Sequence, residues 1–153
     1  LELSDKMSNS GDIFAQKIIE KGNLKLYDVR AIAKAYNMAN KPQLALDIIA
    51  KLPDENMNHW ILYRKAEALL ALNDSTALDV INEALTLAIK DEKAKNNLAS
   101  YHDLVRQCYE KDGNITQALI EAKNAIVETN QDDTVLKSAI EKAGYKVVGI
   151  KNV

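Results

Sequence analysis

Residues that form turns, and cysteine, are scarce in this sequence of 153 residues, which contains 5 Gly, 2 Pro and 1 Cys. With Cys108 as its single cysteine, the chain forms no intramolecular disulfide and offers no cysteine-based zinc site. Few turn residues over this length favour helices over many short strands. Hydrophobic residues make up 47% and charged residues 27% of the chain, so we expect a substantial core rather than disorder.

An excess of charge of either sign is also missing. The 20 basic and 22 acidic residues give a formal net charge of −2, and both signs are spread along the chain. Proteins that bind nucleic acids usually carry a basic patch, so nucleic acid is not an expected partner. No apolar run approaches the ~20 residues of a membrane-spanning helix. We therefore expect no membrane insertion, and a location in either the cytoplasm or the periplasm.

Sequence motifs of catalysis and of cofactor binding are not found. The sequence has no G-x-S-x-G, no H-E-x-x-H, no phosphate-binding glycine loop and no dinucleotide fingerprint. His59 and His102 stand far apart and lack the spacing of metal ligands. Cys108 lies in an apolar helical pattern that is typical of a core residue. We expect no catalytic residue, no cofactor and no metal site, and predict that the chain is not an enzyme.

A helical period runs through most of the sequence, because apolar residues recur at steps of three and four. The pattern predicts helices at about residues 12–21, 24–39, 42–52, 60–70, 77–88, 98–109, 118–126 and 133–143. Pro42 suits the first turn of its helix, where a missing N–H costs nothing. We interpret residues 1–11 as a flexible tail, 12–145 as a single domain and 146–153 as a C-terminal tail.

Three of the breaks between helices are followed by the same arrangement of small residues. An alanine stands early in the next helix and an apolar residue follows seven positions later, at Ala45 and Leu52, at Ala77 and Ala84, and at Ala118 and Ala125. A small residue near a turn lets the two helices of a hairpin approach closely. The preceding helices carry matching small and large residues at Ala33 and Tyr36, at Ala66 and Leu69, and at Tyr109.

On these residues, the stretch from about Leu26 to Asp133 resembles the tetratricopeptide repeat. The resemblance implies an all-α, right-handed superhelix of about three helical hairpins with flanking helices. Arg106 departs from it, because a small residue is usual at that position. The spacing departs as well, since 77 − 45 = 32 and 118 − 77 = 41, against a usual period of about 34. The longer step corresponds to about two extra helical turns, so we predict that the helix at 77–88 extends through Ala88 to Asn97.

The resemblance also implies a concave face that is lined by the first helix of each hairpin and binds a partner. On this chain the implied face includes Arg30, Lys34, Asn37, Met38, Trp60, Tyr63, Glu67, Leu70, Asp103, Gln107 and Glu110. Trp60 and Tyr63 are the strongest candidate anchors, because aromatic residues dominate binding energies at interfaces. For Trp60, packing between helices is an equally good interpretation.

Some members of the family bind a chain-terminal carboxylate with Lys, Asn and Arg at set positions of this face. Arg30 matches one of these positions. The other positions carry Lys34, Arg64, Ser100 and Leu104, which do not match. We therefore expect no carboxylate clamp of that kind.

The sequence as a whole predicts a scaffold that binds a protein or a peptide. Two alternatives stay open. The chain begins with Leu1 rather than Met, so it fits an accessory helical domain of a larger enzyme, including an exported one. An exposed edge, or the β-prone residues Val147 and Val148, would instead allow self-association into a homo-oligomer.

Overall fold

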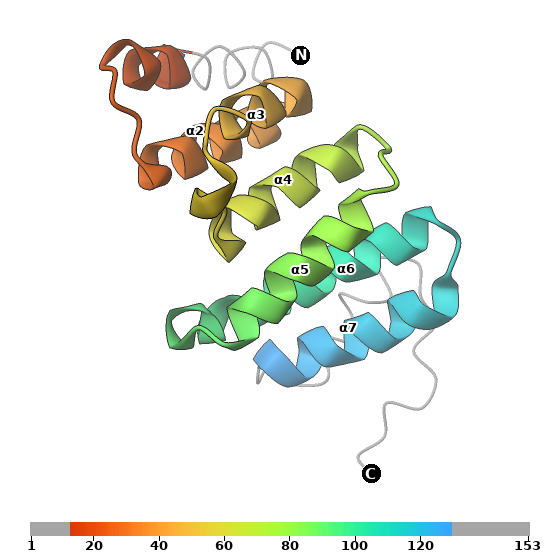
Figure 1. Cartoon of the computed structure of the whole chain (residues 1–153). Helices are drawn as coiled ribbons and strands as arrows, with labels where there is room; N and C mark the ends of the chain where they lie inside the picture. The colour runs from red at the N-terminus through yellow and green to blue at the C-terminus, as the bar shows by residue number, and fades with distance from the viewer. Residues whose placement is uncertain (1–12, 130–153) are drawn as a thin grey trace. The chain divides into compact units, whose positions relative to one another are not determined.

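The computed structural model describes residues 13–129, and every regular element in that range is a helix (Figure 1). The prediction of an all-α protein is therefore confirmed. A helical segment occupies residues 13–20. It is followed by α2 (Leu26–Met38), α3 (Pro42–Ile49), η1 (Asp54–Asn56), α4 (His59–Ala71), α5 (Ala77–Ile89), η2 (Glu92–Asn97), α6 (Leu98–Lys111) and α7 (Ile115–Thr129). The helix predicted at 133–143 and the two predicted tails lie outside the described residues.

The chain forms two compact units, residues 1–87 and 88–153. In the first unit α2 pairs with α3, and α4 packs against both of them (Figure 1). In the second unit α6 pairs with α7 and contacts η2. The single domain expected over residues 12–145 stays a prediction.

Three turns between helices are closed by the same pair of backbone hydrogen bonds. In the first, the N–H of Lys41 donates to the carbonyl of Tyr36 at 2.8 Å, and the N–H of Asn40 donates to that of Asn37 at 3.1 Å. The other turns repeat the pair at Asp74 to Leu69 with Asn73 to Leu70, and at Asn114 to Tyr109 with Gly113 to Glu110. This is the Schellman motif, which requires a left-handed residue just after the helix. Asn40, Asn73 and Gly113 supply it, with φ of 58°, 58° and 76°.

Helix starts follow from local chemistry as well. Asn58 precedes α4, and its Oδ1 accepts the backbone N–H of Ile61 at 3.0 Å. At the start of α2, Oδ2 of Asp28 accepts the N–H of Lys25 at 2.9 Å. Pro42 occupies the first position of α3, as predicted. Each feature satisfies or removes a backbone donor that has no partner inside the helix.

The core of the first unit is built from one face of each helix. Its fully or almost fully buried residues are Ala15, Val29, Ile32, Ala33, Tyr36, Ala45, Ile48, Ile49, Ile61 and Ala68. On α2 these residues recur at steps of three, one and three, the spacing of a helix with one apolar face. The small residues Ala33 and Ala45, which the repeat pattern singled out, are both completely buried. They permit the close approach of helices that the pattern predicts.

The second unit has a smaller described cluster. Ala118 and Ala122 on α7 are buried, and the partly buried Tyr109, Leu119 and Ile126 pack against them. Ala125, the second small residue of the predicted pattern, is only partly buried. On α7 the second small residue that is well buried therefore comes four positions after Ala118 rather than seven.

The prediction that the helix at 77–88 continues to Asn97 is wrong. α5 ends at Ile89, and Asp91 then adopts an extended conformation with φ −103° and ψ 108°. Oδ1 of Asp91 accepts the backbone N–H of Lys93 at 3.0 Å, which starts the separate 3-10 helix η2. Aspartate prefers to cap a helix rather than to continue one, because its carboxylate competes for backbone N–H groups. The extra residues of the long step therefore form a break and a 3-10 helix.

The helix predicted at residues 42–52 is also shorter than expected. α3 ends at Ile49, and Leu52 lies in the following turn, where it still packs against the core of the first unit. Pro53 follows Leu52, and a residue before proline is disfavoured in helical conformation. Leu52 thus packs against the core from a turn and not from the predicted helix.

Candidate functional site

The first unit brings together the predicted surface residues that its helices carry. Arg30, Lys34, Asn37 and Met38 lie on α2, while Trp60, Tyr63, Glu67 and Leu70 lie on α4. The two helices pack against each other. Positions 30, 34 and 37 follow the helical period, so the side chains stand along one stripe of α2. Each of these residues is at least partly exposed to solvent.

Trp60 is held from two sides. The guanidinium of Arg30 lies over its ring, with Cζ 4.4 Å from the ring centroid. The ring of His59, which is buried, lies at 4.3 Å between centroids and is tilted by 48°. A cation over an aromatic face contributes about 0.5–1 kcal/mol at an exposed site. Trp60 is therefore a half-buried, positioned side chain that α2 and α4 hold jointly.

A polar cluster joins the middle of α2 to α4. Nδ2 of Asn37 donates to the backbone carbonyl of Arg64 at 3.0 Å and to Oε1 of Glu67 at 3.5 Å. Nη1 of Arg64 is 2.7 Å from the same Oε1, and its Cζ lies 5.0 Å from the ring centroid of Tyr63. Oδ1 of Asn37 and Nε of Arg64 are buried and make no hydrogen bond. The cluster thus fixes Glu67 as the partner of Arg64 and leaves two buried polar atoms unsatisfied.

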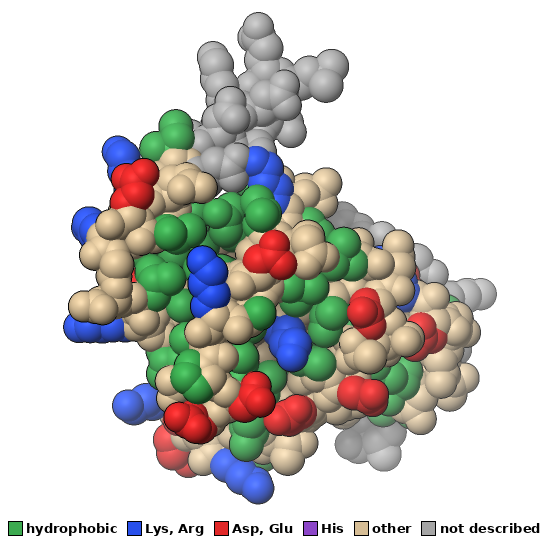
Figure 2. All heavy atoms as spheres, turned by 45° about the horizontal axis from the view of Figure 1, so that its top comes forward, with side chains coloured by type: hydrophobic (Ala, Val, Ile, Leu, Met, Phe, Trp, Pro, Cys, Tyr) green, Lys and Arg blue, Asp and Glu red, His purple; other side chains and the backbone are tan. Residues whose placement is uncertain are grey.

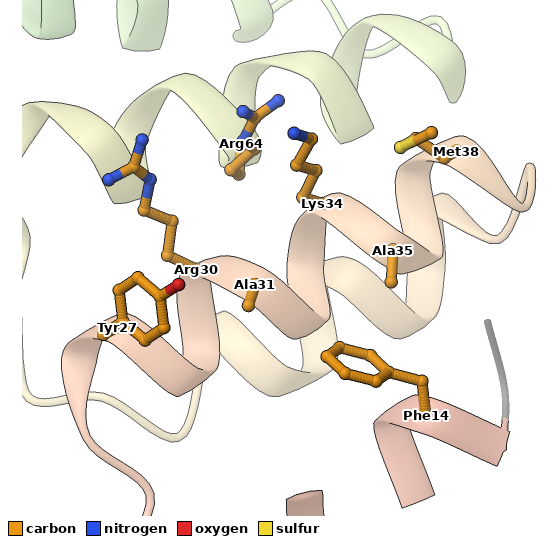
Figure 3. Close-up of a pocket in the computed structure, with 8 residues that line it drawn as sticks. All are labelled: Phe14, Tyr27, Arg30, Ala31, Lys34, Ala35, Met38 and Arg64. Atoms are coloured by element: carbon orange, nitrogen blue, oxygen red, sulfur yellow. The ribbon is translucent and has the colours of Figure 1, made fainter.

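Beside this cluster the first unit contains a pocket of about 370 Å³, which we call the α2 pocket. Its lining residues come from the segment 13–20, from α2 and from α4, and are Phe14, Tyr27, Arg30, Ala31, Lys34, Ala35, Met38 and Arg64. The cationic side chains extend from α2 and α4 into the space between these helices (Figure 3). The Phe14 and Tyr27 rings lie toward the other side of α2, with Ala31 and Ala35 between the two groups (Figure 3).

The sequence pattern singled out only part of this pocket. Arg30, Lys34 and Met38 were predicted, whereas Phe14 and Tyr27 were not assigned to the face. Arg64 entered only as a mismatch to the carboxylate clamp. The spacing of Tyr27, Ala31 and Ala35, four residues apart, is a signal for a second stripe on α2. The place of Phe14 depends on how the segment 13–20 packs, which local periodicity does not reveal.

The remaining predicted surface residues lie on α6 in the second unit and are Asp103, Gln107 and Glu110. Nε2 of Gln107 donates to Oδ2 of Asp103 at 2.9 Å. Arg106 donates to both Asp103 and Glu110, through Nε at 2.8 Å and Nη1 at 2.7 Å. These are contacts along a single helix at steps of three and four residues, and such pairs on a helix contribute a few tenths of a kcal/mol each. They form a polar stripe on α6.

His102 and Cys108 belong to residue types that often act in catalysis or in metal binding, but here they lie in contacts within the fold. Nδ1 of His102 is 2.8 Å from Oε2 of Glu121, and this contact joins α6 to α7. Cys108 is buried, which raises the pKa of its thiol to about 11, and the carboxylate of Asp112 adds to the shift. Among the described residues, no group of three or more His, Cys, Asp or Glu side chains is arranged to hold a metal ion. A thiol with a raised pKa is protonated near neutral pH and is a poor nucleophile.

None of the helices within residues 13–129 combines the length and the apolar character required to cross a bilayer. Comparison of the chain with protein-family models, with curated proteins and with solved structures finds no match.

Proposed function

We propose that the chain is a tetratricopeptide-like array of helical hairpins that binds a segment of another protein on the face shared by α2 and α4. The right-handed superhelix belongs to this proposal. It is supported by the three turns with one hydrogen-bond pattern, because repeated supersecondary units give repeated turns. It is also supported by the buried small residues Ala33, Ala45, Ala66, Ala77, Ala84 and Ala118 at the repeat positions.

The observation that carries the binding role is the arrangement of Trp60. Its ring is partly exposed, yet Arg30 and His59 hold it in place. Binding hot spots are enriched in Trp, Tyr and Arg, and an anchor that is already positioned loses less side-chain entropy when a partner arrives. The face of α2 and α4 therefore has the composition and the rigidity of a protein-binding surface.

A pull-down from source-cell lysate with quantitative mass spectrometry tests this proposal. We expect Trp60→Ala and Arg30→Glu to lose proteins that the unaltered chain captures. Truncation of a hot-spot aromatic costs about 2 kcal/mol or more of binding free energy, or roughly thirtyfold in affinity. Lys51→Glu is the matched control, because Lys51 is exposed in the turn after α3 and carries the same charge change as Arg30→Glu. Circular dichroism of each variant checks that the helices remain.

An identical set of captured proteins for Trp60→Ala, Arg30→Glu and Lys51→Glu would show that this face is not the binding surface. Loss of capture by all three variants would point to charge or folding effects without a specific face. Either result would overturn the proposal.

A further inference from the structure

We propose that the α2 pocket binds an acidic peptide segment through its side-chain carboxylates, together with one apolar side chain of the same segment. This inference rests on the proposed binding function and names the chemistry of its partner. The reasons are the charge of the pocket, the state of its cations and the shape of its apolar part.

The charge of the pocket is strongly positive on a chain that is slightly acidic. Arg30, Lys34 and Arg64 line it, and none of its described lining residues is acidic. The whole chain has a formal net charge of −2. Glu67 offsets part of the charge of Arg64, since the two groups are 2.7 Å apart. The local excess of positive charge therefore favours an anionic partner, which it attracts and orients.

Lys34 is the cation that is most available to a partner. It is exposed, and within residues 13–129 it makes no hydrogen bond or ion pair. The guanidinium of Arg30 lies over the Trp60 ring, but a guanidinium in this position retains in-plane N–H donors that can bind a carboxylate. Two cations on adjacent turns of α2 can thus each meet a carboxylate of a bound chain.

The apolar part of the pocket fits a side chain rather than a bare ion. Phe14, Tyr27 and Met38 are exposed by 49%, 75% and 74%. The small residues Ala31 and Ala35 leave room for an inserted group between the Phe14 ring and the cations, and Met38 lies on the same side of α2 as Lys34 (Figure 3). A volume of about 370 Å³ lies at the lower end of the ~300–1,000 Å³ range of ligand pockets. Hydrophobic side chains are also exposed beside Lys and Arg side chains over the surface in Figure 2.

The length of the surface matches a short extended peptide. From Tyr27 to Met38 the helix rises about 16 Å, at ~1.5 Å per residue. An extended chain covers that distance with about five residues, at ~3.3 Å each. A segment with acidic residues beside a leucine or phenylalanine therefore places carboxylates near Lys34 and Arg30 while its apolar side chain enters between Phe14 and Met38.

A nucleic acid is also anionic, but the lining of the α2 pocket favours a peptide. Single-stranded nucleic acids bind along a basic groove with aromatic residues that stack on successive bases. Here the apolar side chains line one partly open pocket and include a thioether and two alanines, which offer no series of stacking platforms. An oligonucleotide is therefore compared with the peptides as a competing ligand in the experiment.

Fluorescence polarisation with labelled synthetic peptides tests the inference. The probe is a short acetylated and amidated peptide with a central leucine flanked by glutamates, so that it has no terminal carboxylate. Companion peptides replace the glutamates by glutamines, or the leucine by glycine, and a labelled oligothymidine represents nucleic acid. We expect the acidic leucine peptide to bind at least about tenfold more tightly than each companion and than the oligothymidine. Its affinity is expected to fall as salt is raised.

Two variants of the chain separate the parts of the pocket. Lys34→Glu is expected to weaken the acidic leucine peptide about tenfold, whereas the matched control Lys51→Glu leaves it unchanged. Ala35→Leu fills the space between the aromatic residues and the cations, and is expected to weaken the leucine peptide about tenfold while leaving the weak glycine companion unaffected. Thermal unfolding followed by circular dichroism confirms that each variant is folded.

The outcomes distinguish this inference from the proposed function. Equal binding of the acidic and glutamine peptides, or tighter binding of oligothymidine, overturns the acidic-peptide inference. Absence of binding by the acidic leucine peptide overturns it too. In each case the proposed function stands if Trp60→Ala still loses captured proteins, and falls with it if the pull-down is also unchanged.

Discussion

Arg30 and Lys34 are one helical turn apart on α2, yet their surroundings give them different roles. The guanidinium of Arg30 lies over the Trp60 ring, whereas the Lys34 ammonium makes no hydrogen bond or ion pair among the described residues. Arginine stacks well on aromatic faces because its cation is planar and weakly hydrated, and lysine is a mobile, strongly hydrated point charge. Arg30 therefore positions an aromatic side chain, and Lys34 presents its charge to solvent.

Cys108 provides a test at the scale of a single residue. Burial raises the pKa of its thiol from 9.0 to about 11, and the carboxylate of Asp112 adds to this. The unfolded chain loses the thiol proton first as pH rises, so the stability contributed by the protonated thiol is complete below pH 9 and is lost through about pH 11. We expect the free energy of unfolding of the unaltered chain to decrease over this interval relative to that of Cys108→Ala.

Urea unfolding of the two proteins at the two ends of the interval measures this difference. The Cys108→Ala chain has its own constant offset from lost packing, so only the change of the difference with pH matters. Other groups that titrate in alkali are common to both chains and cancel. Parallel stability curves for the two proteins would show that the thiol of Cys108 does not titrate differently in the folded and unfolded chains.

At the scale of the helix and its turn, one residue after each of α2, α4 and α6 must adopt a left-handed backbone conformation. Asn40 and Asn73 adopt it because asparagine tolerates positive φ, and Gly113 adopts it because it has no side chain. The hydrogen bonds that close the turns join backbone groups only. The turns thus depend on one dihedral angle each rather than on packing.

Substitution at Gly113 measures this dependence. A methyl group at this position would meet no atom within 4 Å, so any cost comes from the backbone at φ +76°. We expect Gly113→Ala to lower the free energy of unfolding by about 1 kcal/mol, because a left-handed conformation costs an L-residue about 1–2 kcal/mol. Gly113→Asn is expected to cost clearly less, since asparagine occupies the same conformation in the other two turns.

Chemical unfolding of both variants under identical conditions gives the comparison. Equal destabilisation by Ala and by Asn would contradict the argument and indicate that the αL preference of asparagine has no effect at this turn.

The sequence predicts most of these elements because helices and their turns depend on patterns of residues that are close in the sequence. Asn40, Asn73 and Gly113 each stand in a predicted break, and the apolar steps of α2 to α7 follow the helical period. The 3-10 helix η2 was missed because its Glu, Lys and Ala residues favour a helix, while the decisive feature is the capping carboxylate of Asp91. Much of the α2 pocket was missed because it depends on how Phe14 packs near α2, which is a tertiary contact.

At the scale of the molecule, the two compact units at residues 1–87 and 88–153 predict separate responses to damage in the core. Ile32 on α2 is completely buried in the first unit. Truncation of a buried isoleucine to alanine costs about 2–5 kcal/mol. Since α2 contacts α3 and α4 of the same unit, the loss falls first on the unit that contains the residue.

Hydrogen exchange of Ile32→Ala and Val105→Ala tests this independence. We expect Ile32→Ala to accelerate amide exchange in α2, α3 and α4 while α6 and α7 keep their protection. Val105 is completely buried on α6, and Val105→Ala is the reciprocal variant with the opposite expected pattern. Equal acceleration in both units by both variants would mean that the chain unfolds as one cooperative body.

The hydrogen bonds that close the turns at Asn40, Asn73 and Gly113 join backbone groups within each pair of consecutive helices. A pair of helices that is duplicated or exchanged between genes as one unit, with its ends outside the turn, therefore carries its closing hydrogen bonds with it. The three turns are separated by 73 − 40 = 33 and 113 − 73 = 40 residues. The longer interval contains Asp91 and η2, so a chain that grows by inserted length can do so between hairpins while each hairpin keeps its own geometry.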